Sequence, residues 1–155
     1  MPDDRQPYAG TPGGTRPAPG PNGRLEWSAP AVASNVGVLR SDLVAFAGRH
    51  GAGGPLKDDV ALATSEALAN AVMHGYVGGT PGTLHVIAEH ADGRLVVRVI
   101  DDGRGPGPRG DSPGMGLGTA LMTTLTTQLV IGPGSGGKGT ETRLTFALAA
   151  VAPAS

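Results

Sequence analysis

The spacing of apolar residues along the chain predicts three helices. In residues 31–50, in 57–75 and in 115–127, apolar side chains recur every three or four positions, as on one face of a helix. Gly and Pro residues at 51–55 separate the first two helices, and Gly75 with Gly78 and Gly79 ends the second. The apolar positions of the first and third helices are Val32, Val36, Leu39, Leu43, Phe46, Leu117, Leu121 and Leu125.

The same pattern predicts five strands and an α+β fold. Residues 83–90 and 94–101 form a hairpin around Asp92-Gly93, a typical turn sequence. Residues 24–28, 128–131 and 140–147 are the other strands, which gives the order β-α-α-β-β-α-β-β. Because the strands come in hairpins and the helices are grouped, this order favours an α+β layered domain over a doubly wound parallel sheet.

Three polar residues recur every fourth position on the second helix, namely Glu66, Asn70 and His74. At 100° per residue they lie within an arc of roughly 80°. One interpretation is the wet side of an amphipathic helix. However, the stripe lacks Lys and Arg, and Asn has no propensity reason to lie inside a helix. An Asn oxygen suits Mg²⁺ beside phosphates, and a Glu one turn away suits a general base, whereas the zinc signature HExxH is absent.

Asp101 continues an apolar row. Leu95, Val97 and Val99 alternate along the fourth predicted segment, and Asp101 has the same parity. One interpretation is that the strand ends one residue earlier and Asp101 caps a turn with Gly103. The other is a buried carboxylate that accepts a hydrogen bond from the exocyclic amine of an adenine, since a buried carboxylate needs a partner. Thr140, at the start of the last strand, has inward parity in the same way.

Glycines open the third helix in the segment Gly114-Met115-Gly116-Leu117-Gly118. Glycines let backbone N–H groups approach phosphate oxygens, and a helix N-terminus adds partial positive charge. The segment is not a P-loop, because the lysine of GxxxxGK[ST] is missing. In a chain with 27 Gly, a flexible hinge is the alternative interpretation.

Composition narrows the class of protein. The chain has 155 residues, enough for one domain, with 14 Pro and 27 Gly. Residues 1–23 are rich in Pro and Gly and poor in large apolar groups, so we expect a disordered tail before a domain at 24–149 and a frayed end at 150–155. The net charge of −1 offers no basic surface for nucleic acid, and without Cys there are no disulfides. No apolar run predicts a signal or a membrane span, which favours a cytoplasmic protein.

Taken in order, four segments resemble the motifs of the Bergerat-fold ATPase superfamily, which includes the histidine kinases. Their order and spacing match over residues 24–148. The resemblance implies a two-layer α/β sandwich with a mixed, mostly antiparallel sheet and three helices on one face. The segments are Glu66-Ala-Leu-Ala-Asn70-Ala-Val-Met-His74-Gly75 (the N box), Asp101-Asp-Gly103-Arg-Gly105 (DxGxG), Gly114-Met115-Gly116-Leu117-Gly118 (the second glycine box) and the closing Gly139-Thr140.

Within the superfamily, the short lid, the His74-Gly75-Tyr76 sequence and the lack of a phosphoacceptor-histidine helix pair resemble the anti-sigma factor serine/threonine kinases. The resemblance implies that Glu66 is the general base for a partner's serine and that Asn70 coordinates Mg²⁺. It implies that Asp101 binds the adenine amine of ATP. The remaining nucleotide-binding residues would be His74, Gly103, Gly105, Gly114, Met115, Gly116, Leu117, Gly118 and Thr140.

Family members bind a sigma factor, often as homodimers, and phosphorylate an anti-anti-sigma protein of the STAS fold. The resemblance therefore implies these partners for this chain. Two other functions stay open: a regulatory protein that binds its partner in response to ATP without catalysis, and a detached histidine-kinase-like catalytic domain. The chain departs from the family in its Pro/Gly-rich N-terminal segment and its Gly/Pro-rich lid at 105–113.

Overall fold

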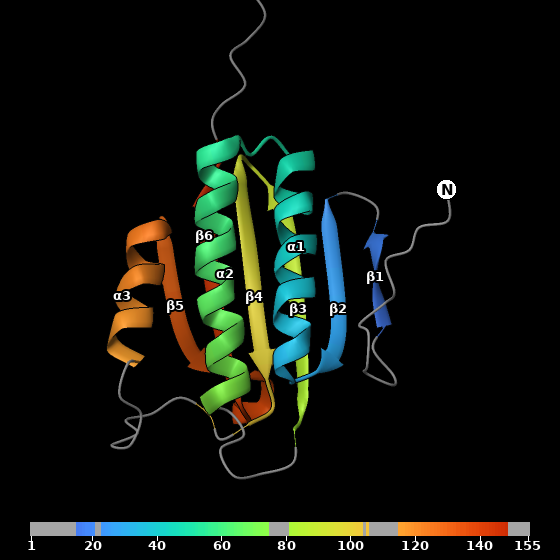
Figure 1. The fold of residues 1–155 in the computed structure, drawn as a ribbon, viewed down its shortest axis with the longest axis vertical. Helices are drawn as coiled ribbons and strands as arrows, with labels where there is room; N and C mark the ends of the chain where they lie inside the picture. Colours follow the sequence, from blue (N-terminus) through green and yellow to red (C-terminus); the bar gives the residue numbers. More distant parts are fainter. Residues whose placement is uncertain (1–14, 21–22, 75–80, 104, 106–114, 149–155) are drawn as a thin grey trace, which may run out of the picture.

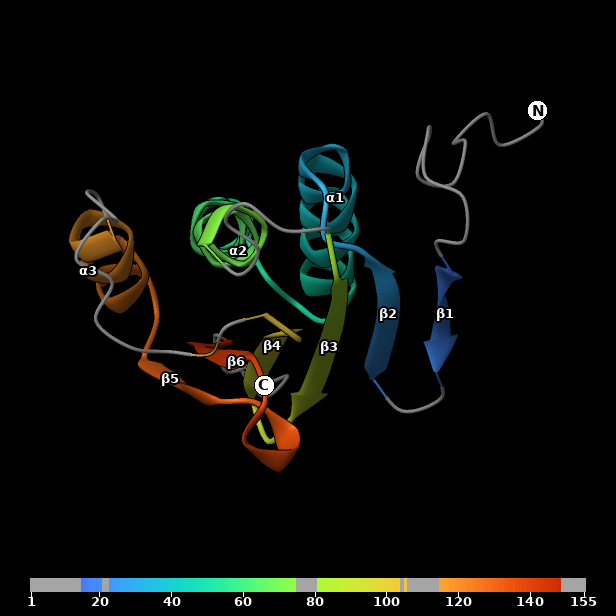
Figure 2. The ribbon, with the colours of Figure 1, turned by 90° about the horizontal axis from the view of Figure 1, so that it is seen from below.

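A sheet and a layer of helices make up the part of the chain that the computed structural model describes, which is residues 15–20, 23–74, 81–103, 105 and 115–148. Within these residues, all three helices cover one face of a six-stranded sheet (Figures 1 and 2). The elements are β1 (Thr15–Gly20), β2 (Arg24–Pro30), α1 (Ala33–Arg49), α2 (Gly54–His74), β3 (Thr83–Ala91), β4 (Arg94–Asp101), α3 (Met115–Leu125), β5 (Gln128–Pro133), a short 3₁₀ turn (Ser135–Gly137) and β6 (Thr140–Ala147).

The sheet has the order β1-β2-β3-β4-β6-β5, and each described pair of neighbours is antiparallel. The sequence predicted a mixed, mostly antiparallel sheet. No parallel pair arises among the described strands, because β6 lies between β4 and β5, which run in the same direction. The predicted α+β class with helices on one face is confirmed.

The strand β1 corrects the expectation that all of residues 1–23 are disordered. Thr15–Gly20 pairs with β2 at the edge of the sheet, with an irregular register between Thr15 and Ala18. Backbone pairing needs no apolar side chains, and an edge strand with a bulge tolerates proline because only some of its N–H groups are needed. The prediction missed this strand because it relied on apolar content alone; residues 1–14 lie outside the described part.

The other predicted elements are present, with shifts at their ends. The helix α2 begins at Gly54, three residues before the predicted start, because Pro55 lacks the N–H that a first turn leaves unpaired anyway. The predicted hairpin turn has Asp92 at φ 53° and Gly93 at φ 70°, as a two-residue turn with left-handed residues requires.

The core lies between the sheet and the helices, with α2 in the middle. This helix contacts β4 and β6 below it and has α1 and α3 on its two sides (Figure 2). The position matters because α2 carries the predicted polar stripe. The largest fully buried side chains include Trp27, Leu39, Leu43, Val60, Leu68, Val86, Val97, Met122 and Phe146.

Two stacked histidines join the end of α1 to the sheet. The rings of His50, which follows α1, and His90, on β3, have centroids 4.6 Å apart, and Phe46 lies 4.5 Å from His50. Burial, and then the charges of His90 and Arg49, lower the pKa of His50. The folded protein therefore holds a proton at His50 less readily than the unfolded chain does.

This difference predicts a pH dependence of stability. A histidine with a lowered folded pKa binds more protons when unfolded, so the free energy of unfolding falls as the pH drops below about 6.5. We expect urea midpoints to decrease between pH 7 and pH 5.5, and His50→Gln to flatten this decrease. An equally steep decrease in His50→Gln would assign the effect to other groups.

Candidate functional site

The polar stripe of α2 lies on the side of the helix that faces α3. The buried side of α2 contains Val60, Ala63, Thr64, Ala67, Leu68 and Ala71. Glu66 and Asn70 are half-buried and border this surface. On the other side, Ser65 faces α1, where its hydroxyl accepts from Arg40 at 3.5 Å. The stripe is therefore not a fully solvated helix face.

Gly118 brings the second glycine segment against the stripe. A Cβ built on Gly118 would lie 2.8 Å from Oε2 of Glu66 and 3.6 Å from Nδ2 of Asn70. Gly118 is in the first turn of α3, where helix N–H groups have no partner within the helix. The absence of a side chain thus lets the Glu66 carboxylate and the Asn70 amide pack against the first turn of α3. A carboxylate, an amide and a helix N-terminus are groups that suit a phosphate and its cation.

The side chain of Asp101 is buried at the end of β4. It is 6% exposed and continues the row of Leu95, Val97 and Val99, all buried, so the predicted parity is confirmed. Its Oδ1 also accepts the N–H of Gly103 at 2.9 Å. The strand does not end one residue earlier, because β4 includes Asp101, but the carboxylate does cap the following turn through Gly103. The hydrogen bond from an adenine amine remains a prediction.

Thr140 and two glycines adjoin Asp101. Thr140 is directly opposite Asp101 in the β4–β6 ladder, so both side chains lie on the helix side of the sheet. Gly139 has φ 70°, and any Cβ there would overlap the backbone carbonyl of Asp101. Gly105 has φ 85°, and its Cβ would lie 3.3 Å from the Gly139 carbonyl oxygen. Only glycine allows these backbones to lie so close together.

These parts meet at one end of the domain. The C-terminal end of α2, the end of β4, the start of α3 and the start of β6 all lie at the lower end in Figure 1. The fold therefore brings four predicted segments, which are far apart in the chain, to the same end of the domain. The carboxylate of Asp101 is in the sheet layer, and Glu66 is in the helix layer.

Some predicted residues are described only in part. His74 is the last residue of α2, and Met115 and Gly116 open α3, but the side chains of His74 and Met115 and the burial of Gly116 are outside the described set. Leu117 is 80% exposed. Gly114 lies outside the described residues. The predicted contacts of these residues with nucleotide remain predictions.

The candidate cation ligand among the described residues is the amide of Asn70, and they contain no cluster of carboxylates. No group of three or more His, Asp or Glu side chains comes together among them. Mg²⁺ often takes one or two protein ligands and completes its shell with phosphate oxygens and water. The amide of Asn70, next to the space at Gly118, suits that kind of binding.

Sequence analysis missed two contributions to the site. Gly139 was assigned no role beyond its Gly-Thr pair, yet it packs on the Asp101 backbone. Asp102 was passed over as well, and its Oδ1 accepts the N–H of Thr83 at 3.0 Å, which ties the turn after β4 to the start of β3. Gly139 could have been suspected, since a glycine directly before a strand often has a positive φ.

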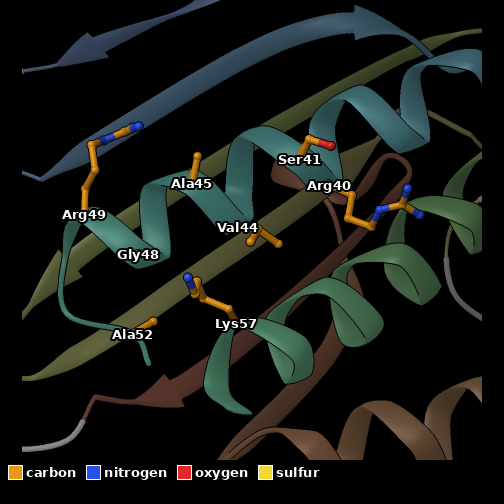
Figure 3. A pocket seen from close by; sticks show the side chains of 8 residues that line it. All are labelled: Arg40, Ser41, Val44, Ala45, Gly48, Arg49, Ala52 and Lys57. Carbon is orange, nitrogen blue, oxygen red and sulfur yellow. The ribbon is translucent and has the colours of Figure 1, made fainter. Parts of the chain in front are cut away.

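A groove of about 650 Å³ lies away from this site (Figure 3). It runs between the second half of α1 and the beginning of α2 and is lined by Arg40, Arg49 and Lys57 around small apolar residues. Lys57 precedes Glu66 by nine residues, about 13 Å along the helix. The groove is therefore separate from the predicted nucleotide site.

The fold and these motifs define an ATP-binding class of protein. Residues 29–146 match the model of the histidine kinase-like ATPase domain, and the chain belongs to this family. Membership implies that it binds ATP. None of the helices in the described ranges is both long and apolar enough to cross a bilayer.

Individual relatives have regulatory names. Over 116 residues the chain is 31% identical to the serine-protein kinase RsbW of Bacillus licheniformis, covering 65% of this chain and 72% of that protein. Over 47 residues it is 36% identical to an anti-sigma F factor of Clostridium botulinum (strain Eklund 17B), covering 30% of this chain and 33% of that protein.

A solved structure shares the fold. The RsbU and RsbW domains of Rv1364c from Mycobacterium tuberculosis match with a TM-score of 0.65 and 28% identity, over 83% of this chain and 33% of that one. The chain thus spans about a third of the length of the anti-sigma F factor and of that solved chain. The recognised superfamily and its RsbW-like branch are confirmed.

The contact at Gly118 suggests a substitution that should change activity while leaving the stability of the fold nearly unchanged. In Gly118→Ala the new methyl is too close only to the end of the flexible Glu66 side chain, which can rotate away, and it makes an ordinary contact with Nδ2 of Asn70. If Glu66 is the base of a kinase, as the resemblance implies, we expect a melting temperature within a few degrees of the wild type but phosphoryl transfer reduced at least tenfold, because a displaced base loses its alignment. Thermal unfolding and a transfer assay measure the two effects. Unchanged transfer would show that Glu66 does not need this space.

Proposed function

We propose that this chain is a Mg-ATP-dependent protein serine/threonine kinase of the anti-sigma type. The observation that supports it most is the position of Gly118 at the start of α3, which places a glycine-lined helix N-terminus against Glu66 and Asn70. A base, a metal ligand and a phosphate-binding helix end are the parts that phosphoryl transfer requires.

In this proposal the nucleotide spans the two layers. The adenine lies at the sheet end, where Asp101 accepts from its amino group and Thr140 supports it; Gly103 and Gly105 allow close approach. The phosphates lie toward Gly114, Gly116 and Gly118, with Met115 and Leu117 beside them and His74 closing the α2 side. Asn70 holds Mg²⁺, which neutralises phosphate charge when bound.

Glu66 acts as the general base. Its carboxylate takes the proton of the acceptor hydroxyl while the hydroxyl oxygen forms a bond to the γ-phosphorus and the bond to the β-phosphate oxygen breaks. The products are a phosphoserine or phosphothreonine and ADP. The pocket motifs contain no lysine, so helix-end amides and the bound cation neutralise the phosphate charge.

The names of the relatives support the proposed partners. The names serine-protein kinase and anti-sigma F factor support a role in which the chain phosphorylates a STAS-type anti-anti-sigma protein, binds a sigma factor, or both, and so regulates transcription by partner switching. A homodimer in the cytoplasm, with no nucleic acid or membrane partner, completes the proposal.

The test is a transfer assay. The protein is incubated with Mg²⁺, labelled ATP and the STAS protein encoded nearest to its gene. We expect acid-stable label on serine or threonine of the STAS protein, dependent on Mg²⁺. Acid-labile label would indicate a histidine-kinase-like catalytic domain instead, and no label at all would overturn the kinase.

One alternative function has its own support. The match to an anti-sigma F factor favours a protein that sequesters a sigma factor in response to ATP without significant kinase activity. Capture of a sigma factor that depends on ATP, together with no phosphoryl transfer to any STAS protein, would favour this alternative. The presence of Glu66 beside Gly118 favours the kinase.

A further inference from the structure

Large apolar side chains are exposed around Glu66. Among the described residues, five large hydrophobic side chains are exposed, and three of them are near this carboxylate: Leu62 at 52%, Met73 at 64% and Leu117 at 80%. Val130 and Ile131, the other two, are on β5. Exposed apolar groups that gather at one place on a soluble protein commonly mark an interaction site.

The helix geometry sets Leu62 and Met73 in line with the base. Leu62 precedes Glu66 by four residues and Met73 follows it by seven, so at 100° per residue the three lie within an arc of about 40°. Glu66 is the only charged residue from Val60 to Met73. An exposed helix side usually carries several charges of both signs, whereas from Val60 to Met73 this side of α2 carries Glu66 alone.

Leu117 adds an apolar group from the other helix. It directly precedes Gly118, where an added Cβ would lie 2.8 Å from Oε2 of Glu66. The three side chains therefore flank Glu66 along α2 and from the first turn of α3. We call Leu62, Met73 and Leu117 the apolar rim.

We propose that the apolar rim is the docking surface for the protein substrate, and that it takes an acceptor segment with apolar side chains beside the phosphorylated hydroxyl. This inference rests on the proposed function. For Glu66 to take its proton, the acceptor hydroxyl must come within hydrogen-bond distance of the carboxylate. The protein that supplies the hydroxyl must then cover the surface around Glu66, and the rim holds the exposed large apolar side chains of that surface.

The charge of the site points to the same chemistry. Glu66 and the phosphates of ATP are negative, so an acidic residue beside the acceptor would be repelled. Arg40 lies on the α1 side of α2, where it donates to Ser65, and the rim side chains themselves offer only apolar surface to bury. The rim therefore selects an uncharged acceptor segment.

The experiment replaces the rim without touching the base. Leu62→Gln and Met73→Gln keep the side-chain length at exposed positions, where substitutions barely affect stability. With the STAS protein as substrate, we expect the KM for that protein to rise about tenfold in each variant, because each loses a buried apolar contact. The KM for ATP, and kcat at saturating protein substrate, should stay within about twofold.

A matched control is Val130→Gln on β5, which is 47% exposed and remote from Glu66 in the fold. It should leave both KM values unchanged. If the rim variants have the wild-type KM for the protein substrate, the proposal that the rim is the docking surface is wrong, while the proposed kinase activity is unaffected. If sedimentation shows that Leu62→Gln and Met73→Gln dissociate a wild-type dimer, the rim is a homodimer surface and the proposal is likewise overturned.

A failure of the proposed kinase activity can be distinguished from a failure of the docking surface. If the wild type transfers no phosphate, the proposed kinase activity is wrong. Calorimetric binding of the STAS protein to the ATP-loaded wild type and rim variants then tests whether the rim is a docking surface. Weaker binding by the rim variants alone supports it. Equal binding, or none even to the wild type, overturns it.

Discussion

Asp101→Asn is expected to reduce the affinity for ATP by at least about a hundredfold. The substitution keeps the size of the side chain, and the Asn oxygen can still accept the Gly103 N–H that Oδ1 accepts now at 2.9 Å. Where the second carboxylate oxygen would accept from the adenine amine, an amide group puts a donor opposite a donor. Losing a charged hydrogen bond and burying two facing donors costs about 3 kcal/mol, roughly a hundredfold in affinity.

Calorimetric titration with Mg-ATP measures the loss, and urea unfolding verifies that the variant folds. Asp102→Asn is the matched control, because it removes the neighbouring charge while leaving an oxygen for the N–H of Thr83. It should bind ATP almost as the wild type does. If Asp101→Asn bound ATP within threefold of the wild type, the adenine would have to lie elsewhere.

The position of Asp101 could be predicted from the sequence, because a strand alternates with a fixed period. Once Leu95, Val97 and Val99 define the buried row, the parity of Asp101 follows, and the structure has the carboxylate 6% exposed. The direction of Glu66 and Asn70 on α2 follows similarly from the helical period. Local periodicity is therefore enough to place individual side chains on the correct side of their own element.

Contacts between different elements could not be predicted from local periodicity. That Gly118 lies beside Glu66 depends on how α3 packs next to α2, and residues 52 positions apart in the chain carry no local signal of their contact. The overlap that a Cβ at Gly139 would cause with Asp101 depends on the register between β4 and β6. Only the resemblance to known motifs linked these segments in advance.

For the strand β1, the sequence predicted disorder where the structure has an ordered element. Its residues are poor in apolar groups, so composition predicted disorder, yet Thr15–Gly20 pairs with β2. Strand pairing at a sheet edge uses backbone groups that every residue except proline supplies in full. Composition reports how much apolar surface a segment can bury and says little about whether a neighbour offers it unpaired backbone groups.

Glu66→Gln is expected to reduce phosphoryl transfer about a thousandfold while leaving ATP affinity within a few-fold of the wild type. A glutamine has the same shape beside Gly118 but cannot accept the proton of the acceptor hydroxyl, and a positioned base contributes about 10²–10⁴-fold. In the proposed function Asp101 and the glycines bind the nucleotide, so binding should survive. Transfer of label to the STAS protein and calorimetry with Mg-ATP measure the two quantities.

The matched control is Asp58→Asn, which changes a carboxylate to an amide at the exposed beginning of the same helix. It should transfer phosphate at the wild-type rate. A Glu66→Gln variant with nearly wild-type transfer would show that another group takes the proton, whereas loss of ATP affinity in this variant would make Glu66 a binding residue. Retained ATP binding with lost transfer is the one result that assigns Glu66 to the chemical step.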